Sequence, residues 1–525
     1  MINDVVIAGA GPNGLMLACE LALAGVRPVV LEKLPEITAE PRANGLVGQV
    51  VRMLDRRGLY ERITGRPQPP EPASDYMFAA MRLDLTVLAD NPLYILPVPQ
   101  ARLTQVLADR AAELGVPVRR GHELTDFRQD DEAVTATVSG PDGPYQLRAK
   151  YLAGADGGHS VTRKRSGIAF PGVTRDNTVS RTVTAGPPAD WIDPGNGALN
   201  VPGYGPIPPL RHLRTETGVF VYAPFPGRPP AIHTLEYGVP EDTTTPLTLA
   251  EMEESVRRVL GAGVPLTPPA GDAPPLLRRL AGTNTRIAER FRDRRVLLVG
   301  DAAHVHSATG GPGLNLGLQD TVNLGWKLAA AVHDPGRDRL LDSYEAERRP
   351  AGQRVIMQTQ AQSALTGPGA DVTALRELFG ELLADLPTVQ RIAETLAGSD
   401  VRYETGTPAG RDVAAESGAH PLTGRFAPDL DLVTADGPVR LAELTRDARP
   451  LLVDLTETGL PPDVLPAGGR GRVVRAKGPT GGVTALLLRP DTYVAWASSA
   501  AGPDAAEIDT LRQAAERWFG DGRDG

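Results

Sequence analysis

The most constraining feature of the sequence is a glycine pattern between an apolar strand and a helix near the start of the chain. The apolar run Val5–Ala8 leads into Gly9-Ala10-Gly11-Pro12-Asn13-Gly14, after which leucine and alanine recur at helical spacing as far as Gly25. Glycines at these positions allow a tight turn and let the backbone approach a pyrophosphate at the positive end of the helix. The pattern predicts a Rossmann-like nucleotide-binding unit.

An acidic residue ends the second strand of this unit. The apolar run Val26–Leu31 ends at Glu32, which lies 32 − 14 = 18 residues past the last glycine, and Lys33 follows it. A carboxylate here can accept hydrogen bonds from both hydroxyls of an adenosine ribose and disfavours a phosphorylated ribose. FAD or NAD is therefore expected in preference to NADP. A glycine-rich turn in an ordinary α/β domain is the alternative, but the strands, helix and acid together favour the nucleotide site.

Two further motifs stand at predicted strand ends. Gly154-Ala155-Asp156-Gly157 ends one apolar run, and Gly300-Asp301-Ala302-Ala303-His304 ends another, before Gly310-Gly311-Pro312-Gly313-Leu314-Asn315 opens a long helix. A carboxylate at a strand end can accept a hydrogen bond from a ribityl hydroxyl. A glycine-rich helix N-terminus offers N–H groups and positive potential to an anionic ring edge. A flavin has these requirements, so we expect FAD at the nucleotide site.

Composition narrows the class of protein. The 525 residues suffice for about three domains, and 41% hydrophobic with 23% charged residues is typical of a globular chain. The formal net charge of −9 argues against a nucleic-acid partner. Cys19 is the only cysteine, which excludes a disulfide within the chain, a cysteine zinc site and a CxxC redox pair. With no export signal and no apolar run of ~18 residues, the sequence predicts a cytoplasmic protein with no membrane association.

Periodicity predicts further elements along the chain. Short alternating runs between proline and glycine clusters, from about residue 170 to 281, indicate an antiparallel sheet. Past about residue 350, a helical stretch leads to a final segment with strand-like pieces. The individual expectations are a helix over 101–114, strands over 133–138, 145–152, 295–299, 450–455 and 484–488, and a helix over 314–332.

With these motifs in this order, the sequence resembles the class A flavin-dependent aromatic hydroxylases, the family of p-hydroxybenzoate hydroxylase. It is most similar to the bacterial branch that acts on aromatic polyketides. The resemblance rests on the glycine motif with Glu32, on the motifs at 154–157 and 300–304, and on their continuation through 317–328. It covers about residues 1–350, and the tail around 485–496 looks like the thioredoxin-like domain of that branch.

The resemblance implies an α/β fold with a discontinuous organisation. A Rossmann-like FAD-binding domain is expected over residues 1–170 and 283–350, with an inserted antiparallel-sheet substrate-binding domain over 171–282. A helical connection over 351–402 then leads to a thioredoxin-like C-terminal domain over 403–525. This last domain cannot perform thiol chemistry, because it contains no cysteine.

The resemblance also implies which residues contact the cofactor. Besides the glycine motif, these are Glu32 with Lys33 (adenosine ribose), Arg42 (pyrophosphate), Gln100 and Asp301 (ribityl chain), Leu124 (adenine, through its backbone), Asp156 (FAD and NAD(P)H), and Pro312, Gly313, Leu314 and Asn315 (the pyrimidine edge of the flavin).

The sequence departs from the family pattern at three positions. Pro312 stands where relatives often have glutamine, which a helix start tolerates. Ala308 stands where relatives usually have a proline that shapes the pocket beside the reactive flavin carbon, so substrate placement is left open. His159 replaces a common arginine, whose phosphate or nicotinamide contact Arg163 is a candidate to make.

The activity implied is that of an FAD-dependent monooxygenase acting in antibiotic biosynthesis. NAD(P)H, a transient co-substrate, reduces the flavin, and O₂ then forms a flavin C4a-hydroperoxide. This species hydroxylates a polycyclic aromatic natural product of the polyketide class. No side chain is assigned a catalytic role, and either a monomer or a homodimer is expected.

Three alternatives remain open. The same flavin peroxide can perform Baeyer–Villiger or ring-opening oxygenation, for which Ala308 leaves room. A redox-silent FAD protein that binds a pathway intermediate is the second. A plain NAD-dependent dehydrogenase is disfavoured, because the Asp301 motif would then have no role.

The inserted sheet carries aromatic residues that can stack on a polycyclic substrate or equally belong to its core. Tyr222, Tyr237 and Ala308 are the substrate-binding candidates. His304 and His306 lack the cysteine or carboxylate cluster of a metal site, so no metal is predicted. An arginine-rich run over 278–295 is interpreted as a solvated face rather than an NADPH site.

Overall fold

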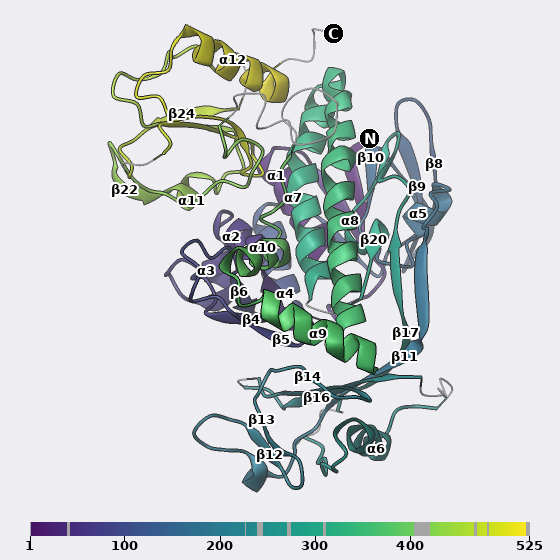
Figure 1. Cartoon of the computed structure of the whole chain (residues 1–525). Helices are drawn as coiled ribbons and strands as arrows, with labels where there is room; N and C mark the ends of the chain where they lie inside the picture. Colours follow the sequence, from purple (N-terminus) through teal and green to yellow (C-terminus); the bar gives the residue numbers. More distant parts are fainter. Residues whose placement is uncertain are drawn as a thin grey trace.

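The computed structural model in Figure 1 arranges the chain around two long helices, α7 (Pro312–His333) and α8 (Asp342–Leu365). The β-sheets lie beside and below these helices, and the C-terminal region lies above and to the left in this view. The structure describes residues 2–38, 43–225, 227–238, 245–269, 275–307, 311–403, 420–466, 470–479 and 482–520.

A mainly parallel sheet forms the first part of the fold. Its strand order is β18-β19-β10-β1-β2-β7, and β1 pairs in parallel with both β2 and β10, while β10 pairs in parallel with β19. The carboxyl ends of these four strands therefore lie at one edge, where the three motifs follow them. The strands are β1 (Asn3–Ala8), β2 (Pro28–Glu32), β7 (Val118–Arg120), β10 (Gly143–Gly154), β18 (Arg292–Asp293) and β19 (Val296–Leu298).

Both faces of this sheet are covered. Val5 and Ile7 of β1 join the core formed with α1 (Pro12–Leu23), α4 (Gln100–Glu113) and α7. Val6 and Ala8 join a second core beneath the antiparallel strands β8 (Glu123–Gln129) and β9 (Val134–Gly140). The continuous apolar run at the start of the sequence is thus explained by burial on both sides.

The predicted helices and strands of this part are confirmed within a few residues. The helix expected over 101–114 is α4, with Gly115 directly after its C-cap at φ 72°, and the one expected over 314–332 is α7. The strands expected over 133–138, 145–152 and 295–299 are β9, β10 and β19.

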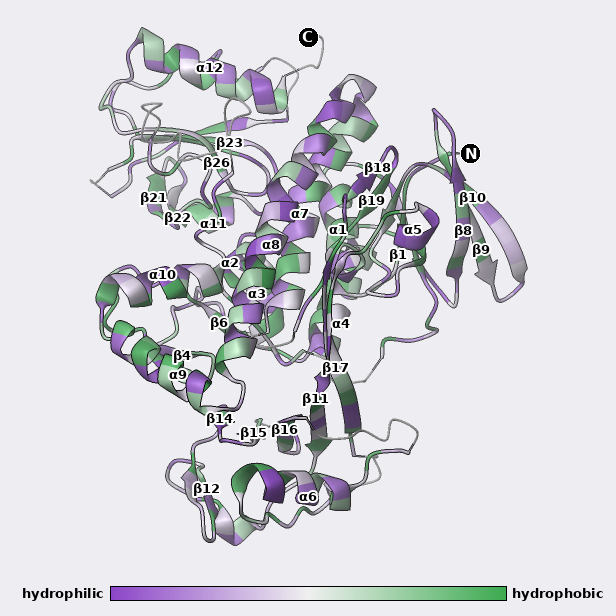
Figure 2. Cartoon of the chain, turned by 45° about the vertical axis from the view of Figure 1, so that its right-hand side comes forward, coloured by the Kyte–Doolittle hydropathy of each residue, from purple (hydrophilic) through white to green (hydrophobic). Residues whose placement is uncertain are grey.

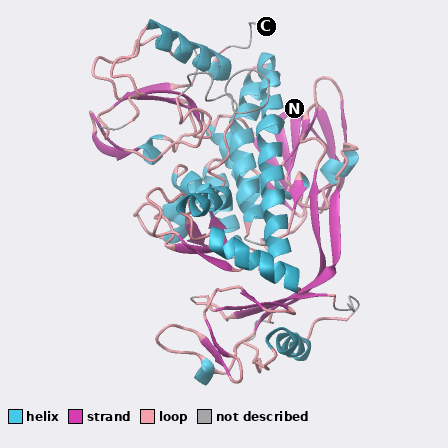
Figure 3. Ribbon diagram, viewed as in Figure 1, coloured by secondary structure: helices cyan, strands magenta, loops and turns pink. Residues whose placement is uncertain are grey.

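A second, antiparallel sheet follows the order β14-β15-β16-β11-β17-β20. Figure 3 shows β11 and β17 as a long two-stranded ribbon that runs from the parallel-sheet region down to this sheet. Helix α6 (Leu249–Leu260) packs against one face of the sheet. The strands are β11 (Gly172–Thr184), β14 (Leu213–Arg214), β15 (Gly218–Ala223), β16 (Ala231–Tyr237), β17 (Leu277–Ile287) and β20 (His304–Val305), with the separate hairpin β12 (Leu199–Val201) and β13 (Gly205–Ile207).

Smaller elements join these two sheets. The hairpin of β4 (Asp75–Phe78) and β5 (Met81–Asp84) shares a core with α8, α9 (Ala370–Leu382) and α10 (Leu386–Ala397). The remaining pieces are α2 (Gln49–Asp55), α3 (Leu59–Thr64), α5 (Val161–Arg165), β3 (Gly45–Val47) and β6 (Ile95–Pro97), with the short 3-10 helices η1 (Ala189–Trp191), η2 (Gly300–Ala302) and η3 (Pro335–Leu341).

The C-terminal region has its own four-stranded sheet in the order β24-β23-β25-β26. Strand β23 is parallel to β24 and antiparallel to β25, and α12 packs against the sheet with its apolar side. Figure 2 shows both hydrophobic and hydrophilic residues along α12, as expected for a helix with one buried face. The elements are β21 (Asp431–Thr434), β22 (Gly437–Arg440), α11 (Leu441–Leu444), β23 (Leu451–Asp454), β24 (Arg472–Arg475), β25 (Ala485–Leu488), β26 (Val494–Ser498) and α12 (Ala505–Phe519).

In the part of the chain that the structure describes, none of the helices has the length and hydrophobicity that a membrane span requires.

Helices α1 and α7 approach each other closely at Gly325. A Cβ atom added there would lie 2.5 Å from the Cβ of Glu20, whose carboxylate is paired with Arg57 at 2.6 Å. We therefore expect Gly325→Ala to lower the free energy of unfolding by about 1–3 kcal/mol, because the helices must separate.

The matched control is Gly380→Ala, since Gly380 lies in α9 with nothing within 4 Å of an added Cβ. This variant should gain about 0.5–1 kcal/mol from helix propensity. Urea unfolding of both variants measures the difference, and equal stabilities would contradict the proposed close packing.

Candidate functional site

The three glycines of the first motif have different structural roles. A Cβ added at Gly9 (φ 104°) would overlap the carbonyl oxygen of Ala155, and one added at Gly14 would overlap the carbonyl oxygen of Gly9. These two glycines are required by the fold itself. Gly11, the N-cap of α1 with φ −70°, has nothing within 4 Å of an added Cβ. Its small size therefore leaves open space beside the N-terminus of α1, as a bound pyrophosphate requires.

Glu32 lies beside this glycine loop. Its carboxylate accepts hydrogen bonds from the backbone N–H groups of Ala10 (2.8 Å) and Leu34 (2.9 Å). Each oxygen keeps a further lone pair, so the carboxylate can also accept hydrogen bonds from a ribose. Lys33 is exposed next to it.

Asn13 joins the first motif to the third. A Cβ added at Gly300 or at Gly317 would overlap the Asn13 side-chain nitrogen, so the amide is wedged between the strand-end loop and α7. Its oxygen is buried and has no hydrogen-bond partner among the described residues. The requirement for glycine at positions 300 and 317 therefore follows from the close approach of α1.

The second motif is tied to the third by Arg163. The guanidinium donates to the carbonyl oxygens of Ala302 (3.0 Å) and Gly158 (2.9 Å) and lies 3.8 Å from the centre of the Phe170 ring. Arg163 is buried, so these contacts account for its guanidinium. These contacts favour a structural role for Arg163 over a phosphate or nicotinamide contact in place of His159.

Asp156 holds the start of α5. One carboxylate oxygen accepts from the backbone N–H and the hydroxyl of Thr162, each at 2.9 Å. The other oxygen is buried without a partner among the described residues, and it remains available to a ligand.

The structure describes four further residues that were predicted to contact the cofactor. Asp301 lies in η2 and is exposed. Asn315, near the start of α7, accepts from the N–H of Val47 (3.1 Å) and donates to the carbonyl of Gly311 (3.1 Å). Gln100 begins α4, and Leu124 is buried in the core that contains Ala8 and Leu31. Two predicted residues, Arg42 and Ala308, lie outside the described residues.

The start of α7 follows the third motif directly. Gly311, its N-cap, has φ 66°, and Pro312 occupies the first turn, as expected for a helix start. Gly313 lies beside the ring of His306, from which an added Cβ would be 3.4 Å distant. Burial lowers the pKa of His306 to about 4, so its imidazole is neutral near pH 7. The N-terminus of α7 thus lies beside a neutral imidazole at His306.

His304 is buried against a carboxylate that the sequence analysis did not assign to the site. Its Nε2 lies 2.6 Å from an oxygen of Asp320, and Arg348 donates to the other oxygen at 2.7 Å. Burial alone raises the pKa of Asp320, but His304 and Arg348 outweigh it and lower the pKa. Among the described residues, no three histidine, cysteine or acidic side chains are grouped as metal ligands.

The two tyrosines predicted to bind substrate lie on opposite faces of the antiparallel sheet. Tyr222 is 2% exposed and belongs to the core beneath α6. Tyr237 lies on the other face, where its hydroxyl is 3.3 Å from that of Thr366 at the end of α8. Packing against α6 accounts for the burial of Tyr222. Of the two tyrosines, Tyr237 therefore remains the candidate for contact with a substrate.

His233 shares the Tyr237 face, because the two residues are four positions apart along β16 and side chains two or four positions apart point to the same side of a strand. Its Nδ1 lies 3.0 Å from the Thr182 hydroxyl. Burial, with the nearby His212 and Arg278, lowers the pKa of His233 to about 4. This face therefore presents neutral imidazole and hydroxyl groups, which can donate and accept hydrogen bonds. His233 was not among the residues predicted to bind substrate.

The arginine-rich run is mostly paired with acids or carbonyl groups, and the side chains of Arg279 and Arg292 are largely buried, so the run is less solvated than the sequence predicted. Arg292 pairs with Asp338 and Asp342 (2.7 Å to Asp342). A surface cavity of about 590 Å³ nearby has five acids and four bases in its wall, which disfavours a phosphate site. Its lining residues are Arg290, Arg292, Arg294, Arg295, Asp130, Asp131, Asp338, Asp342 and Glu345.

Comparison with known proteins identifies the family. A family model described as an FAD binding domain matches residues 3–359, and one described as the C-terminal region of aromatic-ring hydroxylases matches residues 420–522. The FAD-binding match, together with similarity to named monooxygenases, shows an FAD-dependent monooxygenase. The chain belongs to the class A flavin-dependent aromatic hydroxylase family, and its cofactor is FAD.

Several relatives are similar over the whole chain. Identity is 38% to 12-dehydrotetracycline 5-monooxygenase/anhydrotetracycline 6-monooxygenase of Streptomyces rimosus, with 99% of each chain covered. It is 35% to dialkyldecalin synthase of Streptomyces rugosporus, again over 99% of each. The solved structure of an anhydrotetracycline hydroxylase from Streptomyces rimosus matches with a TM-score of 0.81 and 37% identity over 99% of each chain.

The difference between the glycines gives a direct test of the cofactor site. Gly11→Val introduces a side chain into open space, so the FAD-free protein should keep its thermal midpoint while the dissociation constant for FAD rises at least about tenfold. Gly14→Ala, the matched variant, forces the loop apart and should lower the midpoint of the FAD-free protein as well.

Flavin fluorescence titration and thermal denaturation measure the two effects. Unchanged FAD affinity in Gly11→Val would show that the pyrophosphate does not bind beside Gly11.

Proposed function

We propose that this enzyme uses NAD(P)H and O₂ to insert one oxygen atom, by hydroxylation, into a polycyclic aromatic natural product of the polyketide class. The observation that carries the proposal is the convergence of the three motifs at one sheet edge, in a chain similar along its whole length to a tetracycline-pathway monooxygenase. Fold similarity alone would not support a substrate class.

FAD fits the residues at this edge. The N-terminus of α1 at Gly11, with Arg42, would hold the pyrophosphate, and Glu32 the adenosine ribose. Asp301 and Gln100 would hold the ribityl chain, with the start of α7 at the pyrimidine edge of the ring. When bound, FAD supplies hydride acceptance from NAD(P)H and the activation of O₂. The protein positions the ring, stabilises negative charge at the N-terminus of α7 and excludes water.

We place the substrate against the Tyr237 face of the antiparallel sheet. That face is turned away from α6. Tyr237 on this face contacts Thr366 at the end of α8. The backbone N–H of His212 lies 3.5 Å from the sulfur of Met77 in the β4–β5 hairpin. His233 and Tyr237 supply polar groups that suit the phenol and carbonyl oxygens of a polyketide.

We also propose the division of the chain predicted from the sequence. The parallel sheet with α7 forms the FAD-binding domain, and the antiparallel sheet with α6 forms the inserted substrate domain. The C-terminal sheet has the order and strand directions of a thioredoxin-like fold without crossover helices among its described residues.

Two alternatives retain FAD. The similarity to a dialkyldecalin synthase, a name that denotes no oxygenation, favours a protein that binds a pathway intermediate without redox turnover. Baeyer–Villiger or ring-opening oxygenation adds the same mass as hydroxylation but changes the connectivity of the product. NMR of the product distinguishes these oxygenations.

The experiment that tests the proposed function is NAD(P)H consumption by the FAD-loaded protein with a panel of polycyclic phenols and quinones. We expect one group of these compounds to stimulate oxidation and to yield a product heavier by one oxygen atom. Single-ring phenols serve as the control panel. Bound FAD with no stimulated oxidation, but conversion of a compound to an isomer, would support the redox-silent alternative instead.

The position of the substrate is tested by a pair of tyrosine variants. Tyr237→Phe should raise KM for the substrate about three- to tenfold with FAD binding unchanged, because a hydroxyl facing the substrate is lost. Tyr222→Phe, on the α6 face, should leave KM unchanged. Steady-state kinetics measure both, and the opposite ranking would move the substrate to the other face of the sheet.

A further inference from the structure

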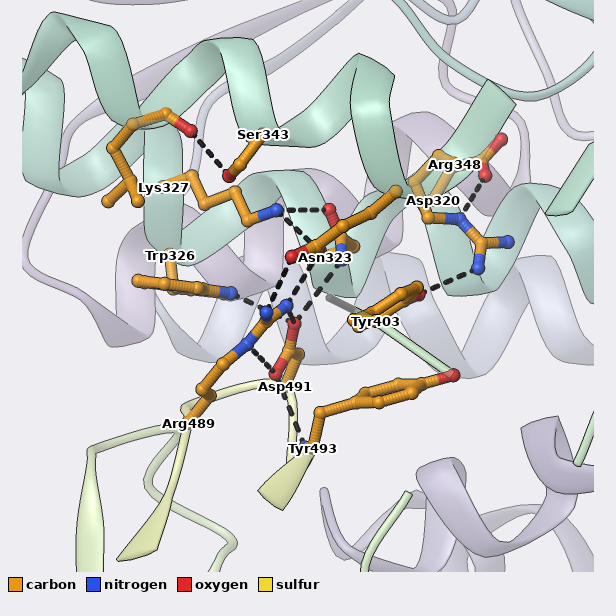
Figure 4. A network of polar contacts seen from close by, with 12 residues as sticks. Asp320, Asn323, Trp326, Lys327, Ser343, Arg348, Tyr403, Arg489, Asp491 and Tyr493 are labelled. Atoms are coloured by element: carbon orange, nitrogen blue, oxygen red, sulfur yellow. Dashed lines mark hydrogen bonds and ion pairs between the residues drawn. The ribbon is translucent and has the colours of Figure 1, made fainter. Parts of the chain in front are cut away.

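Two consecutive residues of α8 connect the flavin-side loop with the C-terminal region. Glu347 pairs with Arg489, which precedes β26, and Arg348 pairs with Asp320 of α7. All four side chains are almost completely buried. Figure 4 shows the network that they form with their neighbours.

On the flavin side, Asp320 fixes the loop that follows β19. Its carboxylate lies 2.6 Å from His304 and accepts a hydrogen bond from the N–H of Gly300 (3.3 Å). Arg348 holds the same carboxylate and also donates to the carbonyl of Leu316 (3.2 Å). Both ends of the loop 300–304 are therefore attached to one carboxylate, whose own orientation depends on Arg348.

On the C-terminal side, Arg489 makes two parallel hydrogen bonds to Glu347, at 2.6 and 2.8 Å. Lys327 of α7 donates to the same carboxylate at 2.7 Å. Burial alone raises the pKa of Glu347, but Arg489 and Lys327 outweigh it and lower the pKa to about 2. The Arg489 guanidinium also lies 5.2 Å from the Trp326 ring centre and 4.6 Å from that of Trp518.

Tyr403 links the two halves. Its hydroxyl lies 2.9 Å from a guanidinium nitrogen of Arg348, and its ring stacks on Tyr493 with centres 4.0 Å apart. The backbone N–H of Tyr493 donates to Asp491, which accepts a hydrogen bond from Arg489 as well. A continuous set of contacts thus runs from β26 to His304.

Apart from His304, the charged side chains of the network are equal numbers of acids and bases. Three acids (Asp320, Glu347 and Asp491) face three bases (Lys327, Arg348 and Arg489), and each is less than a tenth exposed. Buried charges must keep their partners, because the loss of one leaves another unpaired in a medium of low polarity. A substitution at the C-terminal end of the network is therefore expected to shift the residues around His304 as well, because side chains this deeply buried have too little contact with solvent to compensate a lost partner.

We propose that the C-terminal region, residues 420–520, positions the flavin-binding loop 300–307 through this network, with Arg348 and Tyr403 as positioning residues. The inference rests on the proposed function only in assigning loop 300–307 to FAD. It gives the C-terminal region, which contributes no residue to the predicted cofactor site, a role in how the flavin is held.

The test removes a single hydroxyl. Tyr403→Phe cuts the link to Arg348 and leaves all six charges in place. In the FAD-free protein, amide hydrogen exchange of residues 300–307 should become faster, and the dissociation constant for FAD should rise about three- to tenfold. The visible circular dichroism of the bound flavin should change as well, because the ring is held in a less defined orientation.

The matched control is Tyr151→Phe. Tyr151 is equally buried, and its hydroxyl donates to Asp338 (2.8 Å), outside the network. This variant should leave the exchange of 300–307, the FAD affinity and the flavin spectrum unchanged. A loss common to both variants would indicate general destabilisation and overturn the proposal.

A second variant tests the C-terminal end. Trp326→Phe removes the hydrogen bond from the indole nitrogen to Asp491 (3.1 Å) and should accelerate exchange in the same loop, by less than Tyr403→Phe does. Faster exchange confined to residues 420–520 in both variants would show that the network only anchors the C-terminal region. A wild-type protein that binds no FAD would instead refute the proposed function.

Discussion

The close approach of three backbone segments at the carboxyl edge of the parallel sheet determines the rest of the structure. Gly9 lies against the backbone at Ala155, and Asn13 is wedged between Gly300 and Gly317, so none of these glycines tolerates a Cβ. This contact brings the N-termini of α1 and α7 to the same side of the sheet. One extended nucleotide can then contact both helix ends, each of which favours negative charge.

Much of this region could be predicted from the sequence, because its signals are local. The run Val5–Ala8 is apolar throughout since its residues alternate between two cores, and the glycines and Glu32 follow at fixed short distances. The start of α7 was equally recognisable from Pro312 and the glycines around it. Strands β1 and β2 are parallel neighbours, so Glu32 at the end of β2 lies beside the glycine loop that follows β1 and contacts Ala10.

The remainder depends on contacts between distant segments. Charged residues such as Arg348 and Arg489 usually indicate a solvated surface. Only the packing of α8 against the C-terminal region buries these two arginines, each against its own acidic partner. Arg163 is a similar case. Tyr222 and Tyr237 lie on different strands, so only the pairing register of β15 and β16 shows that they point to opposite faces of the sheet. Asp320 and Lys327 belong to the sequence motif at 317–328, but nothing in the sequence pairs them with α8 or with the turn between β25 and β26.

The central claim is that one chain holds one FAD, without a covalent bond, where these segments meet. The most direct measurement is the flavin content of the purified protein after gel filtration and after acid precipitation. The account predicts a yellow protein with one FAD per chain, all of it released into the supernatant by acid. A colourless protein that takes up no FAD, or flavin that stays with the precipitate, would contradict it.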